Sequence, residues 1–296
     1  MSDDQDTTER SEKNKVFQEM KKVAMRATGE PLATSMGTKI PRKLEFEIPT
    51  ELAPLPSKGL VYPEGSPLHN KTDLSIRAIS ANEEDITHSA ALIKQGKMVD
   101  MLIQSCMLEK GIDPSDMIAG DRNAVLLVLR AHSYDEGVYK AEVSCTECKE
   151  KQETEFSILE FPIKTLSIEP VAPGLNLFSF TLPKTKKEVH FKLLTGKDEL
   201  NISKEAEMRK KQGLVVEKSV TTTLMHSIVS IDGVTDRTEI SEFVRFMPGQ
   251  DSKELRKYIE ANTPGLDTKK KIECKHCSET FEAEMPVGAD FFWPTL

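Results

Sequence analysis

Hydrophobic and polar residues follow two different periods along the chain, and these periods predict both strands and helices. Near the start, Leu44, Phe46 and Ile48 alternate with two glutamates, which is typical of a strand with one side facing solvent. Apolar residues then recur at helical spacing from about residue 82 to residue 130. Residues 125–129 are apolar without interruption, so we expect this last helix to lie at the centre of the core.

The second part of the chain repeats this mixture of periods. Residues 136–159 predict two strands joined by a turn, and residues 160–195 predict further strands between Gly and Pro breakers. Residues 197–230 are helical in pattern, and shorter helices follow, one of them near residues 239–246. The sequence therefore predicts an α+β fold, with a helical core and antiparallel β-hairpins.

Length and composition divide the chain into three parts. With 296 residues it holds about two domains' worth of sequence. Residues 1–40 combine mixed charge with few apolar residues and predict a flexible N-terminal arm. Residues 41–160 form a first half with helices and a hairpin. Residues 161–296 form a second half with strands, helices, a hairpin and an aromatic tail.

Three helix starts are predicted from side chains that commonly cap helices. Asn82 precedes acidic residues that suit the first turn of a helix. Asp121 and Asp251 each precede a helical pattern that leads to a pair of cysteines. We expect both aspartates to be the N-caps of equivalent helices.

Two segments share one order of features, which indicates an internal repeat. Each has an aspartate at a helix start, then a helix, a strand, a Cys-x-x-Cys turn and a second strand. Asp121 lies 24 residues before Cys145, and Asp251 lies 23 residues before Cys274. Unrelated loops would rarely match so closely, so we interpret the segments as copies of one helix–strand–turn–strand unit.

The cysteine pairs predict a metal site. The four residues are Cys145, Cys148, Cys274 and Cys277. One Cys-x-x-Cys turn supplies half of a tetrahedral zinc site, and two turns brought together complete a closed, structural, zinc-ribbon-like site. Three alternatives stay open: a redox dithiol, which needs its first cysteine at a helix start; a catalytic zinc ion with an open position; and cysteines that bind no metal.

The charge of the chain helps to decide which class of partner it binds. The net charge is −8 and the pI is about 5.5, which disfavours binding of nucleic acid over the whole surface. Lysines nevertheless gather near the cysteine turns. They are Lys149, Lys151, Lys269, Lys270, Lys271 and Lys275. A zinc-ribbon protein that binds nucleic acid is therefore the alternative hypothesis, although these lysines also balance the charge of four thiolates.

Several other classes of protein are disfavoured. No apolar run approaches the length of a membrane span, and the N-terminus lacks the features of a signal peptide. Five cysteines make no disulfide framework, so we expect a soluble protein made in a reducing cytoplasm. Phosphate-binding loops, nucleophile elbows and metalloprotease motifs are missing from the sequence, which predicts that the chain is not an enzyme.

The C-terminus carries unusual apolar surface for a chain end. Phe291, Phe292 and Trp293, which is the only tryptophan, precede a proline. Such a tail either docks into its own core or binds a partner protein. We therefore name these three aromatic residues as candidate partner-binding residues.

Three features together resemble a known family. They are the loop of residues 55–63 (LPSKGLVYP), the helix of residues 120–134 that begins Gly-Asp-Arg and ends Arg-Ala-His-Ser-Tyr, and the second cysteine hairpin with its Asp-Phe-Phe-Trp-Pro end. They are similar to the baseplate hub subunit and baseplate hub assembly proteins of T-even-type bacteriophages. The resemblance covers about residues 41–296 and does not choose between a hub subunit and an assembly factor.

The resemblance implies a function that the composition does not. It implies a non-enzymatic protein of the contractile phage tail that works by contacts with other baseplate and tail proteins. It also implies a location in the host cytoplasm during assembly, or in the tail of the virion. A metal-dependent enzyme, with an open zinc position in a cleft, is a further alternative.

Overall fold

The structure is a computed structural model and describes residues 48–134, 137–213, 219–286 and 291. These residues belong to one compact unit, Ile48–Leu296. The predicted arm of residues 1–40 lies outside the described residues, as do most of the strand predicted near Phe46 and the tail residues Phe292 and Trp293.

The first half of the described chain carries two hairpins with helices between them. Its elements are β1 (Thr50–Pro54), β2 (Asp73–Arg77), α2 (Ala81–Thr87), α3 (Ala90–Gln95), α4 (Met98–Cys106), the 3-10 turn η1 (Pro114–Asp116), α5 (Ala119–Ser133), β3 (Val138–Ser144) and β4 (Lys151–Ser157). The order is hairpin, helices, long helix, hairpin.

The second half follows the same general order after a short connection. Its elements are the 3-10 turn η3 (Ile158–Glu160), β5 (Ile163–Lys164), β6 (Phe178–Thr181), β7 (Glu188–Phe191), α6 (Gly196–Lys211), α7 (Ser219–Ser227), β8 (Ile228–Ile231), α8 (Arg237–Phe246), α9 (Gly249–Asn262), β9 (Gly265–Leu266), β10 (Lys269–Glu273) and β11 (Thr280–Glu284). The fold is therefore a mixture of helices and antiparallel strands, and the predicted α+β class is confirmed.

All paired strands in the described residues are antiparallel, and they form small sheets. β1 pairs with β2, β3 with β4, β5 with β9, and β10 with β11, while β6, β7 and β8 form one three-stranded sheet. Sheets this small bury little by themselves, so the helices must supply most of the core.

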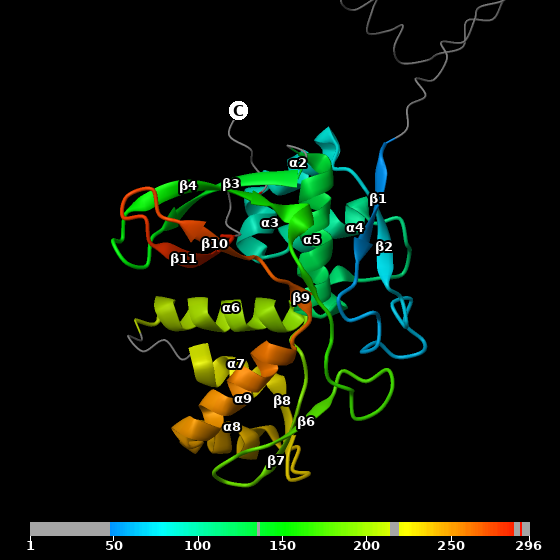
Figure 1. The fold of residues 1–296 in the computed structure, drawn as a ribbon. Helices are drawn as coiled ribbons and strands as arrows, with labels where there is room; N and C mark the ends of the chain where they lie inside the picture. The colour runs from blue at the N-terminus through cyan, green and yellow to red at the C-terminus, as the bar shows by residue number, and fades with distance from the viewer. Residues whose placement is uncertain (1–47, 135–136, 214–218, 287–290, 292–296) are drawn as a thin grey trace, which may run out of the picture. The chain divides into compact units, whose positions relative to one another are not determined.

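Helix α5 supplies the centre of that core, as its apolar run predicts. Val125 and Leu129 are fully buried, and α5 contacts β1, α4 and β9. Figure 1 shows α5 between the β1–β2 hairpin and the two Cys hairpins. At its first turn, Gly120 meets Pro264 so closely that an added Cβ would lie 1.8 Å from the Pro264 carbonyl oxygen, so the end of the second half packs directly on the start of α5.

The predicted helix caps are wrong in all three cases. The N-cap of α2 is Ser80, two residues before Asn82, and Ser80 forms a capping box with Glu83. The residue before α5 is Ile118, and the residue before α9 is Pro248. Asp121 and Asp251 each lie at the third residue of their helix, and both side chains are fully buried instead of capping.

Candidate metal centre

The two Cys-x-x-Cys turns have the same backbone geometry. The N–H of Cys145 donates to the carbonyl of Glu150, and the N–H of Cys274 donates to that of Glu279, both at 2.9 Å. In each turn the residue after the second cysteine has a positive φ, 63° at Lys149 and 59° at Ser278. These are tight hairpin turns, which fold the two thiols of each pair toward one side.

The fold brings the two turns together, so the four thiols meet as predicted. The Sγ atoms of Cys145 and Cys277 are 3.8 Å apart, and those of Cys148 and Cys274 are 3.6 Å apart. All four sulfurs lie within 4.8 Å of one another. Four sulfurs that surround a zinc ion tetrahedrally at ~2.3 Å lie about 3.8 Å apart, so the spacing fits a metal ion with four thiolate ligands.

The environment of the sulfurs favours the thiolate form at Cys274, whereas partial desolvation and the neighbouring thiols raise the pKa of Cys277 in the same turn. The backbone N–H groups of Cys277 and His276 point at the Cys274 sulfur and lower the pKa of this thiol to about 6. Cys145 and Cys274 are buried, whereas Cys148 and Cys277 are exposed. The ion would therefore lie at the surface end of the hairpins, with one buried and one exposed ligand from each turn.

The fifth cysteine, Cys106, has a different role. It is fully buried in the core on α4, and burial raises the pKa of its thiol to about 12. A neutral thiol in such a place behaves as a small apolar side chain.

Polar side chains hold the hairpins together beside the cysteines. The amide of Gln152 on β4 donates to the carbonyl of Glu273 at 3.2 Å and accepts from the N–H of Lys275 at 2.8 Å. Lys270 Nζ donates to the carbonyl of Glu155 at 2.7 Å. The hairpins β3–β4 and β10–β11 thus lie side by side through side-chain bridges, without backbone pairing between β4 and β10.

The comparisons with known proteins identify the family. A sequence model described as T4 bacteriophage base plate protein matches residues 66–293, which is most of the chain and includes all four cysteines. The chain belongs to this family of phage base plate proteins. No curated protein and no solved structure matches the chain.

In this base plate protein the two buried aspartates accept hydrogen bonds from loops that begin with the same dipeptide. Asp121 accepts from the N–H and the hydroxyl of Ser57, in the loop that begins Leu55-Pro56, and also from the Tyr62 hydroxyl. Burial raises the pKa of the Asp121 carboxyl against the effect of these three donors.

The second aspartate repeats this arrangement. Asp251 accepts from the N–H groups of Lys184 and Thr185, and from the Thr185 hydroxyl, in the loop that begins Leu182-Pro183. In both halves a Leu-Pro loop that connects two hairpin strands therefore docks on the first turn of the helix before the Cys hairpin. Sequence reasoning named the aspartates and the loop of residues 55–63, but it missed the second Leu-Pro loop and the contacts between loops and aspartates, although the repeated Leu-Pro was a visible signal.

A second matched contact lies at the start of the first helix of each half. In the first half, Arg77 at the end of β2 forms an ion pair of 2.8 Å with Glu83, which is also the capping-box partner of Ser80. The Arg77 hydrogen bond holds the pKa of the Glu83 carboxyl well below its usual range.

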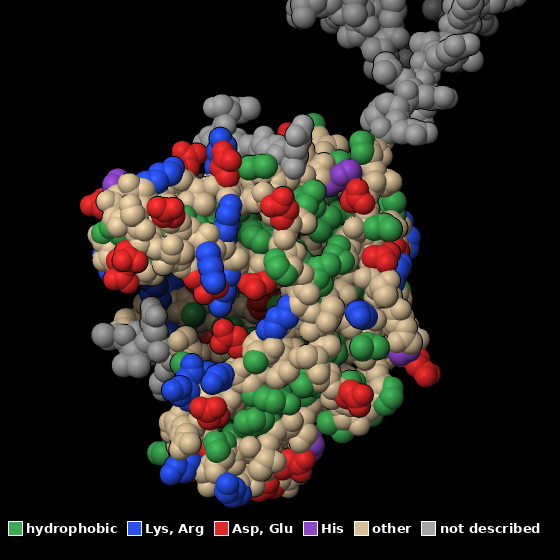
Figure 2. Space-filling model, in the orientation of Figure 1, with side chains coloured by type: hydrophobic (Ala, Val, Ile, Leu, Met, Phe, Trp, Pro, Cys, Tyr) green, Lys and Arg blue, Asp and Glu red, His purple; other side chains and the backbone are tan. Residues whose placement is uncertain are grey.

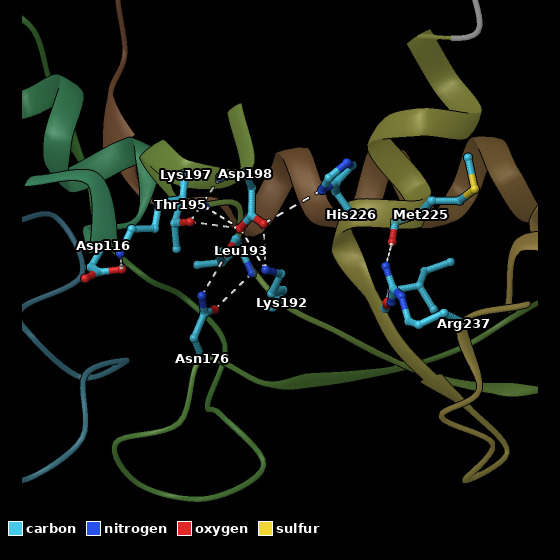
Figure 3. Close-up of polar contacts among 11 residues, drawn as sticks. Asp116, Asn176, Lys192, Leu193, Thr195, Lys197, Asp198, Met225, His226 and Arg237 are labelled. Atoms are coloured by element: carbon cyan, nitrogen blue, oxygen red, sulfur yellow. Dashed lines mark hydrogen bonds and ion pairs between the residues drawn. The ribbon is translucent and has the colours of Figure 1, made fainter. Parts of the chain in front are cut away.

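The second half has three residues of the same chemical kinds, basic, hydroxyl and acidic, at the same offsets. Lys192 follows β7 and forms an ion pair of 2.8 Å with Asp198, the capping-box partner of Thr195 (Figure 3). Sequence analysis missed this pair of motifs. The signal was a basic residue, then Ser or Thr three residues later, then an acidic residue three residues after that.

The structure describes one residue of the aromatic tail, Phe291. Phe291 is fully buried, with its ring 5.1 Å from that of Tyr139 in an edge-to-face arrangement. Its carbonyl accepts a hydrogen bond of 2.7 Å from Nε of the buried Arg130. The Phe291 side chain is therefore covered by this chain's own α5 and β3, and a partner-binding role stays a prediction for Phe292 and Trp293.

Proposed function

We propose that this chain is a non-enzymatic protein of the phage tail baseplate, either a hub subunit or a hub assembly factor. The observation that carries the proposal is the family match over residues 66–293. Proteins of a baseplate act by contacts with other tail proteins, and we propose such proteins as the partners. On this proposal the chain is made in the host cytoplasm and is found in the virion only if it is a hub subunit.

We further propose that the ion held by the four cysteines is zinc in a structural role. Four thiolates at tetrahedral spacing leave no open position for a substrate, which favours a closed site over a catalytic one. The two ligand pairs are more than 120 residues apart in the sequence. Zinc would therefore tie the last hairpin of each half to the other, which suits a rigid building block.

The matched contacts support an internal duplication as the origin of the two halves. Each half has a Leu-Pro hairpin loop, a capping box with a basic partner, a buried aspartate at the third residue of a helix, and a Cys-x-x-Cys turn. We propose residues 41–160 and 161–296 as the two copies, as the sequence predicts.

Binding of nucleic acid by the Cys hairpins is less well supported. Residues 138–157 and 269–284 contain seven lysines and nine glutamates. Several lysines are also engaged with acidic or carbonyl groups, as in the Lys151–Glu142 ion pair of 2.7 Å. Four metal-bound thiolates add negative charge, so this surface lacks the excess of cations that binding to phosphates requires.

The test is an affinity capture of the tagged chain from phage-infected cells, with mass spectrometry of the captured proteins and of purified virions. We expect other baseplate proteins in the capture. Presence in virions then assigns a hub subunit, and absence assigns an assembly factor. Capture of nucleic acid that nuclease removes, without any tail protein, would overturn the proposal.

A further inference from the structure

A large hollow lies beside the second Cys hairpin. Its volume is about 850 Å³, and it is lined by the start of α5, the end of α9, and β9 to β11. Buried apolar side chains form part of its floor, among them Leu126, Leu127, Pro264 and Met285. Figure 2 shows a hollow on this face between the Cys hairpins and the helices below them, with basic and acidic side chains around it.

A second hollow extends the first into a groove. It measures about 370 Å³ and shares Ala119, Gly120, Glu199, Glu260 and Thr263 with the larger one. It continues between α5, α7 and α9 toward Leu224 and Arg256. A continuous groove of this form suits an extended peptide segment better than a compact small molecule.

In the second half, the groove lies at the position that corresponds to the Phe291 site of the first half. Phe291 contacts Arg130, nine residues after Asp121, and Tyr139, six residues before Cys145. The residues nine after Asp251 and six before Cys274 are Glu260 and Thr268, and both line the groove.

Another matched hydrogen bond supports this correspondence at the end of the two helices. The Ser133 hydroxyl donates to the carbonyl of Leu129, and the Thr263 hydroxyl donates to that of Ile259, both at 2.7 Å. The first half therefore has its site filled by an aromatic side chain of this chain. The described residues leave the second half's site as a hollow.

The charges of the groove differ from those around Phe291. Five carboxylates line the two hollows, together with three cationic side chains. The carboxylates are Glu199, Glu260, Asp267, Glu282 and Glu284, and the cations are Lys164, Lys269 and Arg256. Glu260 occupies the position that Arg130 has in the first half. A positively charged hydrogen-bond donor in the first half is therefore replaced by a negatively charged acceptor in the second. Such a rim attracts lysine or arginine.

We propose that this groove binds an extended segment of a partner protein that carries a large apolar side chain flanked by lysine or arginine. The apolar side chain takes the place that Phe291 takes in the first half, and the flanking cations meet Glu260 and the β11 carboxylates. The inference rests on the proposed function in two respects: the proposed duplication places the counterpart of the Phe291 site here, and the natural source of the segment is another tail protein.

The experiment uses two labelled peptides and purified full-length protein. The probes are Lys-Phe-Phe-Trp-Pro-Lys and its matched control Glu-Phe-Phe-Trp-Pro-Glu, and fluorescence anisotropy reports binding. The test variants are Glu260→Lys combined with Glu284→Lys, which reverse charge at exposed positions, and Thr268→Trp, which fills the hollow without changing charge. The control variant combines Glu64→Lys with Glu242→Lys, which reverse the same charges at exposed positions outside the lining of either hollow.

We expect the wild type to bind the lysine peptide about tenfold more tightly than the glutamate peptide, which corresponds to about 1.4 kcal/mol. The charge-reversal variant should lose this preference, Thr268→Trp should weaken both peptides, and the control variant should behave like the wild type. Thermal melting of each variant verifies folding.

Three results would overturn the proposal. One is equal or absent binding of the two peptides by the wild type. The second is binding only after removal of residues 292–296, which would make the chain's own tail the occupant. The third is self-association of the wild type that the variant with Glu260→Lys and Glu284→Lys loses, which would make a second copy the occupant. The proposed function is tested independently by the capture from infected cells, so either idea can fail without the other.

Discussion

The side chain of Gln152 accepts a hydrogen bond from the backbone N–H of Lys275, 123 positions later in the sequence, at 2.8 Å. The same amide donates to the carbonyl of Glu273. One side chain thus satisfies two backbone groups of the other Cys hairpin, on the inner side of the strand pair, where it is buried. The hairpins are held in register by this contact as well as by the proposed ion.

Replacement of Gln152 should therefore weaken both stability and metal binding. Gln152→Ala removes two partly buried hydrogen bonds, to the Lys275 N–H and the Glu273 carbonyl, each worth about 0.5–1.5 kcal/mol, so we expect a loss of about 1–3 kcal/mol in the free energy of unfolding. Urea titration measures this loss. Glu153→Ala, at an exposed neighbouring position, is the control and should change the free energy by less than about 0.5 kcal/mol. Equal effects of the two changes would contradict the role of the bridge.

Removal of one ligand tests the metal site directly. We expect about one zinc ion per chain by elemental analysis, and Cys274→Ser should lower this content and the melting temperature. Cys106→Ala is the control, because it removes a buried thiol away from the site, so it should keep the zinc. Full zinc content in Cys274→Ser, or none in the wild type, would contradict the site.

The zinc content should also depend on pH in a defined direction. The Cys274 thiol has its pKa lowered to about 6, so it is a thiolate at neutral pH and becomes protonated as the pH falls through that value. Because protons compete with the ion for the sulfur, zinc affinity should decrease steadily between about pH 7.5 and pH 5. Competition with a chromophoric chelator at several pH values measures this. An affinity that stays constant over this range would contradict thiolate ligation.

The buried aspartates should matter more than helix caps do. Asp121→Ala leaves the Ser57 N–H and the hydroxyls of Ser57 and Tyr62 without their acceptor, so we expect a loss of about 3 kcal/mol or more. Asp251→Ala should have a comparable effect, because it also removes the acceptor of three donors. Asp85→Ala, at an exposed position of α2, should cost little. Urea unfolding compares the three variants. A loss near about 1 kcal/mol for both Asp121→Ala and Asp251→Ala would instead fit a simple helix-capping role for these two aspartates.

The Glu83 carboxylate should contribute stability that acid removes. Its pKa is lowered by Arg77, so it remains ionised in the folded protein at a pH where the unfolded chain has already bound the proton. Its contribution is complete above the unfolded pKa of about 4.3 and is lost as the pH falls through the folded pKa. Glu83→Gln should therefore be less stable than the wild type at pH 6, and the difference should shrink toward pH 3. The difference in the free energy of unfolding between the two proteins is measured at each pH, so any loss of metal common to both cancels. A difference that does not shrink would contradict the ion pair.

The features predicted correctly from the sequence are those that depend on local pattern. The apolar run at Val125 and Leu129 marks the central helix because such a run has no polar side to present to solvent. The Cys-x-x-Cys spacing marks two tight turns, and their repeated context correctly indicated that the pairs would meet.

The features that were missed depend on contacts between distant segments. An aspartate at a helix start is read as a cap because capping is the common local solution. Asp121 is instead the acceptor for a loop 64 positions earlier, which only the tertiary fold brings to it. The groove beside Glu260 likewise has no local signature, because five separate segments line it.

The last prediction concerns the tail and separates its two parts. Phe291 is fully buried against Tyr139, and its carbonyl accepts from Arg130, so Phe291→Ala removes packing from the core of this chain. We expect a loss of about 3–5 kcal/mol in the free energy of unfolding of the isolated protein.

Deletion of residues 292–296 keeps Phe291 and should leave most of that stability intact. If Phe292 and Trp293 bind a partner, the deleted chain should melt near the wild-type temperature but fail to capture baseplate proteins from infected cells. A deletion that lowers the melting temperature as much as Phe291→Ala would instead place these rings in this chain's own core. A deletion that changes neither stability nor capture would mean that they bind nothing.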